Sequence, residues 1–234
     1  TDGESSHVTT DLALDWIGKA AKSDKPFLAV IWFGNPHSPH VAVDKYKKMY
    51  ADQPDGAAHF YGEITAMDAA LGELRKGIRR LGVADNTVLW YCSDNGAIPK
   101  GSTGGLRARK GSLYEGGIRV PLIAYWPGRV KAGSVSDHIC AHWDLMPTFC
   151  ELAKISTPKH TDGISYIPAL TGGKQKKHDY LYWEFHSYGN AQAIRMGDWK
   201  AIRLNVKNDP DAPIQLYNLK QDIGETKNIA ATHP

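Results

Sequence analysis

The longest apolar run of the chain, residues 27–33, is the feature that most constrains its fold. A continuous run of this length is typical of a strand covered on both faces. Apolar residues then recur at steps of three and four over residues 61–81, which predicts an amphipathic helix. A second strand is predicted at residues 87–92. Because the order strand, helix, strand is typical of a parallel sheet, the chain is expected to be an α/β protein.

The remaining elements extend this pattern and then depart from it. Cap and periodicity signals predict helices at residues 10–22 and 143–154. A further strand is predicted at residues 120–126. After Pro158, short runs rich in aromatic and β-branched residues predict an antiparallel sheet, with a hairpin turn at Gly197-Asp198. These runs are residues 180–185, 191–196, 199–204 and 215–219.

The expected fold class is therefore α/β, with a mostly parallel sheet sandwiched by helices. Residues 1–174 are predicted to form this α/β domain, and residues 175–234 a small antiparallel β subdomain. The formal charge of +3, from 28 basic and 25 acidic residues, is too even to imply nucleic-acid binding by charge. No apolar stretch approaches the roughly 18 residues of a membrane span. Three cysteines without metal-ligand spacing indicate small buried side chains rather than a disulfide scaffold.

Polar residues follow the predicted strands at their carboxyl ends, where open α/β sheets bind ligands. Asp94 and Asn95 come directly after the strand at residues 87–92 and offer a charged and a neutral oxygen, which suit Ca²⁺ or Mg²⁺. Two ligands are too few for a calcium site, so further ligands must come from elsewhere. The alternative is a simple Asx turn, because Asp-Asn-Gly is favourable turn chemistry.

Two other segments supply candidate anion contacts. Lys110 lies among glycines and next to Arg107 and Arg109, and a glycine-rich loop lets a cation approach an oxyanion closely. His37 and His40 follow the strand at residues 27–33, and we expect anion contact rather than metal ligation from them. The alternatives are a solvated basic loop for Lys110 and two ordinary loop histidines.

The order of these motifs resembles the type I sulfatases, the arylsulfatase branch of the alkaline phosphatase superfamily. The order is His-x-Pro-His, an amphipathic helix, Ser-Asp-Asn-Gly after a strand, and then Lys-Gly-x-x-Tyr-Glu-Gly-Gly-Ile-Arg-Val-Pro. Further matches lie in the segments that begin at Met67, Arg195 and Leu216, so the resemblance covers nearly the whole chain.

The resemblance implies a site that holds Ca²⁺, with Mg²⁺ less favoured, and a sulfate ester. Asp94 and Asn95 match the family's metal-binding pair, and Lys110 matches its sulfate-binding lysine. His37 is the better match for the family's sulfate-contacting histidine, and His40 is the weaker one. Lys110 and His37 are therefore the predicted catalytic residues, and both histidines and Lys110 the predicted substrate contacts.

One expected part of a sulfatase is absent from this sequence. The family's nucleophile is a Cys or Ser in Cys/Ser-x-Pro-x-Arg that is oxidised to formylglycine, and none of the three cysteines is followed by that pattern. The start at Thr1 reads as the middle of a longer protein. We therefore expect an N-terminal sulfatase segment or chain to carry the formylglycine, and the isolated chain to be inactive.

The predicted function is a sulfuric ester hydrolase that releases sulfate from a sulfated aryl compound or glycan. The alternatives are a non-catalytic domain that binds sulfated glycans, or a phosphoester hydrolase of the same superfamily. The family resemblance favours a secreted, periplasmic or lysosomal location. Four aromatic residues of the C-terminal region are candidates for the rim of a sugar-binding cleft or for hairpin packing: Trp183, His186, Tyr188 and Trp199.

Overall fold

The structure, a computed structural model, describes residues 3–188 and 190–233. The chain forms two compact units, Thr1–Val88 with Trp126–Gly128, and Leu89–Tyr125 with Arg129–Pro234. The predicted boundary near residue 175 stays a prediction. In the part of the chain that the structure describes, no helix is long and apolar enough to cross a membrane.

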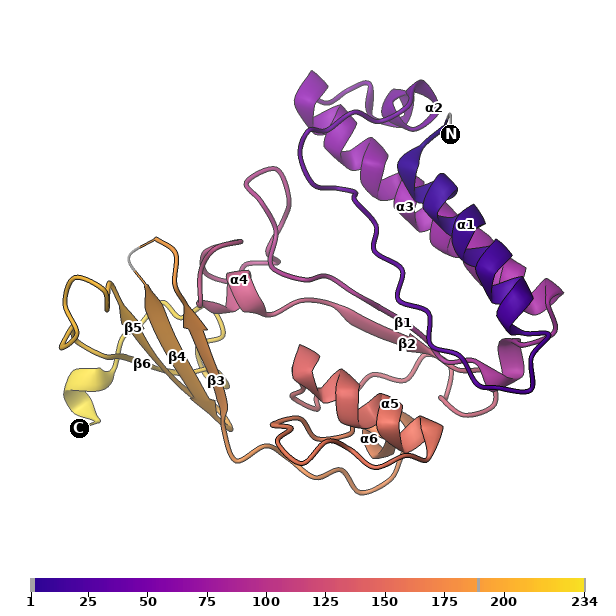
Figure 1. The fold of residues 1–234 in the computed structure, drawn as a ribbon. Coiled ribbons are helices and arrows are strands. Elements are labelled where there is room, and N and C mark those ends of the chain that lie inside the picture. The colour runs from indigo at the N-terminus through magenta and orange to yellow at the C-terminus, as the bar shows by residue number, and fades with distance from the viewer. Residues whose placement is uncertain (1–2, 189, 234) are drawn as a thin grey trace. The chain divides into compact units, whose positions relative to one another are not determined.

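The first unit is helical. It contains α1 (Ser5–Ala20), the short α2 (Asp44–Lys47) and the long α3 (Asp55–Arg80), with 3-10 turns at Lys48–Tyr50 and Ala84–Asn86. Figure 1 shows α1 lying alongside α3, and the buried residues between them include Ile17, Leu74 and Ile78. Both predicted long helices are confirmed, although each begins at least one turn earlier than the apolar pattern indicated.

The predicted strand at residues 27–33 is wrong, because these residues do not form a strand in the structure. In the described chain this segment pairs with no strand, and Figure 1 shows it as a coil between α1 and α2. Leu28, Val30 and Trp32 are 57%, 63% and 86% exposed, while the alternate positions are half-buried. Exposure thus alternates with the period of two that a strand covered on one face would show. The continuous apolar sequence had instead indicated a strand covered on both faces. A strand requires a partner for its backbone N–H and C=O groups, and apolar composition alone does not supply one.

The second unit contains two antiparallel sheets. β1 (Leu89–Cys92) pairs with β2 (Leu122–Tyr125), so the strand pairs formed by the described residues are all antiparallel and the predicted parallel pairing is not among them. The predicted helix at residues 143–154 is confirmed as a 3-10 turn (His142–Asp144) that continues into α5 (Leu145–Ala153). Two short helices, α4 (Glu115–Ile118) and α6 (Ile167–Thr171), complete this part.

The predicted C-terminal sheet is confirmed. Four strands follow the order β3-β4-β5-β6, namely β3 (Leu181–Phe185), β4 (Ala191–Met196), β5 (Trp199–Leu204) and β6 (Gln215–Asn218). Met196 pairs with Trp199 across the predicted Gly197-Asp198 turn, where Gly197 has a φ of 57°. One face of this sheet packs on the segment before α4, in a core of Leu113, Tyr114, Ala193, Ile202, Tyr217 and Leu219.

The contact between α1 and α3 depends on a glycine and can be tested. A Cβ at Gly77 of α3 would overlap the Leu14 side chain of α1, whereas a Cβ at Gly72 of the same helix would meet no atom within 4 Å. We expect Gly77→Val to lower the free energy of unfolding by about 1–3 kcal/mol through overpacking. Gly72→Val, the matched control, should change it by no more than about 0.5 kcal/mol. Urea denaturation measures both values, and equal effects would contradict the close packing.

Candidate functional site

The loop after β1 carries the predicted metal ligands. Asp94 is exposed and Asn95 is half-buried. The Ser93 hydroxyl donates a hydrogen bond of 2.8 Å to the Asn95 carbonyl, which fixes the turn. A Cβ at Gly96 would overlap the Gly116 carbonyl, so only glycine fits where this loop meets α4.

Backbone hydrogen bonds join this loop to the segment that carries Lys110. Gly96 N–H donates to the Gly117 carbonyl at 2.9 Å, and Lys110 N–H donates to the Ala97 carbonyl at 3.1 Å. The Arg109 guanidinium adds two further bonds to the same loop, to the Ile98 and Gly101 carbonyls. The loop that carries Asp94 and Asn95 and the segment that carries Lys110 are therefore neighbours within one unit.

Lys110 itself has a side chain that is available to a ligand. It is exposed, and none of the described residues forms an ion pair or hydrogen bond with its ammonium group. The backbone on either side is left-handed, with φ values of 61° at Ala108 and 84° at Gly111. This segment thus presents the ammonium from a tightly folded loop.

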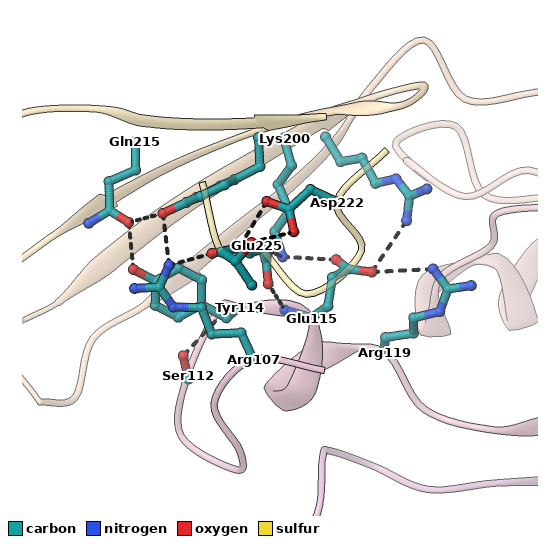
Figure 2. Close-up of polar contacts among 12 residues, drawn as sticks. Arg107, Ser112, Tyr114, Glu115, Arg119, Lys200, Gln215, Asp222 and Glu225 are labelled. Carbon is teal, nitrogen blue, oxygen red and sulfur yellow. Dashed lines mark hydrogen bonds and ion pairs between the residues drawn. The ribbon is translucent and has the colours of Figure 1, made fainter. Parts of the chain in front are cut away.

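A buried charge cluster anchors the same segment to the C-terminal sheet (Figure 2). Lys200 of β5 is fully buried, and its ammonium lies 2.8 Å from Glu115 Oε1 and 3.0 Å from Glu225 Oε1. Glu225 Oε2 accepts a hydrogen bond of 2.6 Å from the backbone N–H of Glu115. The other oxygen of Glu115 lies 3.5 Å from Arg119 and 3.6 Å from Arg195.

Burial perturbs the members of this charge cluster. It raises the pKa of the Glu225 carboxyl, against the opposing effects of the Lys200 ammonium and the Glu115 N–H. It also lowers the pKa of the Arg195 guanidinium, which the charge of Glu115 opposes. The charges of Glu225 and Arg195 are thus stabilised mainly by their partners rather than by solvent.

Arg107 lies in an exposed basic loop, but its guanidinium is bonded to residues of the C-terminal sheet and its following segment. Its guanidinium donates to the Glu225 carbonyl at 2.6 Å and to the Tyr217 hydroxyl at 3.0 Å, and it lies 4.0 Å from the centre of the Tyr114 ring. Figure 2 shows this stack beside the charge cluster. The sequence grouped Arg107 with Lys110, but the two side chains have different surroundings.

The two candidate histidines belong to the first unit and differ in environment. His37 is exposed, and its Nδ1 lies 2.9 Å from the Ser38 carbonyl, while no described residue is bonded to its Nε2. The His40 side chain is 8% exposed, packs on the Phe60 ring, and has its Nδ1 3.1 Å from Glu63 Oε2. These contacts favour a packing role for His40. The meeting of either ring with Lys110, Asp94 and Asn95, which belong to the second unit, stays a prediction.

The sequence analysis did not predict the charge cluster. The segments around Lys200 and Glu225 were noted only as matches to a family pattern, and their pairing with Glu115 links positions 85 and 110 residues apart. A second contact between distant residues, from the half-buried His178 Nε2 to the buried Asp144 Oδ1 at 2.8 Å, was also missed. Among the described residues, no group of three or more His, Cys, Asp or Glu side chains could hold a metal ion.

Comparisons with known proteins identify the family of this chain. The sulfatase family model matches residues 2–155, and the model of the C-terminal region of N-sulphoglucosamine sulphohydrolase matches residues 108–233. The chain therefore belongs to the sulfatase family.

Individual relatives support this family assignment. A sulfatase from Formosa agariphila is 32% identical over 100% of this chain, and human arylsulfatase A is 29% identical over 93% of it. The chain spans about half the length of these relatives, 48% and 47% respectively. The crystal structure of Ps i-CgsB superposes with a TM-score of 0.88 at 30% identity and covers 97% of this chain and 51% of its own. These similarities confirm the predicted α/β class.

The charge cluster predicts a specific loss of stability. Lys200→Met would leave the Glu115 and Glu225 carboxylates buried without their cation, so we expect the free energy of unfolding to fall by about 3–5 kcal/mol. Hydrogen exchange should accelerate first at the amides of residues 107–117. Lys207→Met, at an exposed lysine of the same unit, is the matched control. If both variants unfold at the same denaturant concentration, Lys200 does not anchor this segment.

Proposed function

We propose that this chain forms part of a sulfuric ester hydrolase that releases inorganic sulfate from a sulfated carbohydrate or aryl compound. The observation that carries the proposal is the exposed ammonium of Lys110 on a loop hydrogen-bonded to the Asp94–Asn95 loop. Family membership supports the class of reaction. A structure of Ps i-CgsB in complex with k-i-k-neocarrahexaose supports a carbohydrate substrate.

Two residues would act on the sulfate group. Cleavage of a sulfate ester places negative charge on the leaving oxygen and on the non-bridging oxygens. The Lys110 ammonium would bind the non-bridging oxygens, and His37 would present its free Nε2 to the same group. Fixed positive and polar groups of this kind lower the barrier because they are already oriented when the charge develops. His40 would act indirectly, because its contacts with Phe60 and Glu63 attach the loop that carries His37 to α3.

Asp94 and Asn95 would hold part of a Ca²⁺ site. A carboxylate and an amide oxygen suit a hard cation, and the exposed Asp94 carboxylate accepts no hydrogen bond from the described residues. Two residues do not complete a calcium shell, so the remaining ligands would come from other sulfatase sequence, with Mg²⁺ as the less favoured ion. The bound cation would add positive charge beside the sulfate.

The nucleophile would come from a second sulfatase segment or chain. The 234 residues contain no Cys/Ser-x-Pro-x-Arg pattern, the site of formylglycine in the family. The same observation favours a second candidate function, a non-catalytic domain that binds sulfated glycans. An assay of the chain joined to its native upstream sequence, with an aryl sulfate and an aryl phosphate, separates these functions. Cleavage of the sulfate alone supports a sulfatase, cleavage of the phosphate supports a phosphoester hydrolase, and no cleavage supports a binding domain.

The role of Lys110 can be tested in the complete enzyme. Because removal of one oriented charge-stabilising donor typically costs roughly 3 kcal/mol of barrier, we expect Lys110→Ala to lower kcat by a factor of about 100–1,000. The melting temperature should not change, since the side chain is exposed. Lys207→Ala, at another exposed lysine, is the control and should keep normal turnover. Normal turnover by Lys110→Ala would exclude Lys110 from the mechanism.

The metal assignment has its own test. A ligand bound only by the native state raises the melting temperature, so CaCl₂ should stabilise the complete enzyme. We expect Asp94→Ala to weaken calcium binding at least ~10-fold, measured by isothermal titration calorimetry of the metal-free enzyme. Asp137→Ala, at an exposed aspartate of the same unit, is the control. Unchanged affinity in Asp94→Ala would show that the metal, if bound, lies elsewhere.

A further inference from the structure

Tyr188 is an unusually exposed aromatic residue in the connection between β3 and β4. Its side chain is 89% exposed, compared with 58% for Tyr180 and 44% for Tyr182, the two nearest tyrosines in the sequence. None of the described residues forms a hydrogen bond with its hydroxyl. The ring therefore contributes little to the core, and both its faces and its hydroxyl are largely open to a ligand.

The position of the Tyr188 ring is nevertheless defined. A Cβ at Gly111 would lie 3.0 Å from Tyr188 Cε2, so the ring lies over the glycine and any side chain there would crowd it. The Phe185 ring supports Tyr188 from β3, at a centroid distance of 6.1 Å. Both contacts lie within the second unit. The exposed ring therefore flanks the residue that directly follows Lys110.

The backbone of Tyr188 indicates that this placement has a cost. Its φ is 54°, in the left-handed region, where a bulky residue is an outlier. A left-handed conformation of a residue other than glycine costs on the order of 1 kcal/mol, and such residues cluster at ligand sites. A glycine or asparagine at this position would avoid the cost but would remove the ring from beside Lys110.

We propose that the Tyr188 ring forms a binding subsite for the ring of the substrate, the sugar or aryl group that carries the sulfate ester. The inference rests on the proposed function, in which Lys110 binds the sulfate group itself. The apolar face of a sugar or an aryl ring stacks on an aromatic side chain, and the free hydroxyl of Tyr188 can bond to a sugar hydroxyl. Lys110 then binds the sulfate group, which all substrates share. Tyr188 selects for the sugar or aryl group to which the sulfate is attached.

Ligands with and without a ring separate the two roles. Phenyl sulfate, glucose 6-sulfate and methyl sulfate carry the same anion, but methyl sulfate has no ring to stack. We expect the 234-residue chain to bind the two ring-bearing esters more tightly than methyl sulfate in an NMR chemical-shift titration. Tyr188→Ala should weaken the ring-bearing esters about threefold to tenfold and leave methyl sulfate unchanged. Tyr188→Phe should retain the binding of phenyl sulfate, and Tyr180→Ala should behave as the unaltered chain.

Each outcome decides one of the two claims. The subsite is overturned if Tyr188→Ala binds all three esters as the Tyr180→Ala control does, or if the unaltered chain binds phenyl sulfate no better than methyl sulfate. An effect of Tyr188→Ala on methyl sulfate as large as that on phenyl sulfate overturns it as well, because the ring would then act only on the fold of the loop. Lys110→Ala should weaken all three esters. If it weakens none, the proposed function fails, whatever Tyr188 does.

Discussion

The burial of one ammonium group between two carboxylates determines how the candidate site is built. Lys200 has no contact with solvent, and Glu115 and Glu225 compensate its charge. The desolvation of each ion costs several kcal/mol, which is offset only while all three groups stay together. Glu115 begins α4, directly after the Lys110 segment, so that segment cannot leave the sheet without leaving buried charges unpaired. The C-terminal sheet thereby becomes a support for the loop that carries Lys110.

Glycines allow the segment fixed by the charge cluster to pack closely against the loop that carries Asp94. Gly116 and Gly117 lie so close to neighbouring backbone that a Cβ at either would overlap carbonyl oxygens, and Gly96 meets the same turn from the other side. The hydrogen bond from Gly96 to Gly117 and that from Lys110 to Ala97 depend on this close approach. The charge cluster fixes the segment, and the glycines let the two loops share a backbone network. Together the two features hold the backbone of the Lys110 segment against the residues that follow Asp94.

Local signals in the sequence predicted most elements, and the failures have a common cause. The helices around Ile17 and Leu74 and the hairpin at Gly197 depend on periodicity and turn chemistry within one segment, and all three are present. The run at residues 27–33 had the composition of a strand, but pairing depends on a partner that composition does not specify. Glu115, Lys200 and Glu225 are distant in sequence, and each resembles an ordinary surface residue until the fold brings them together. For His40, the sequence could not show that Glu63, one helix away, lies against its ring.

The chemistry proposed for this chain is electrostatic rather than bond-forming. Under the proposed function the chain would contribute an ammonium, an imidazole and two oxygen ligands for a cation, while its sequence lacks the family's nucleophile pattern. In a sulfatase these functions are separable, because binding and charge stabilisation act on the oxygens of the ester while the nucleophile acts on sulfur. Substrate selection is then a property of the loops that surround the anion. The β3–β4 connection extends from a sheet anchored to the Lys110 segment by the charge cluster. In the proposed arrangement, changes in that connection would alter which alcohol is accepted while the sulfate contacts stay in place.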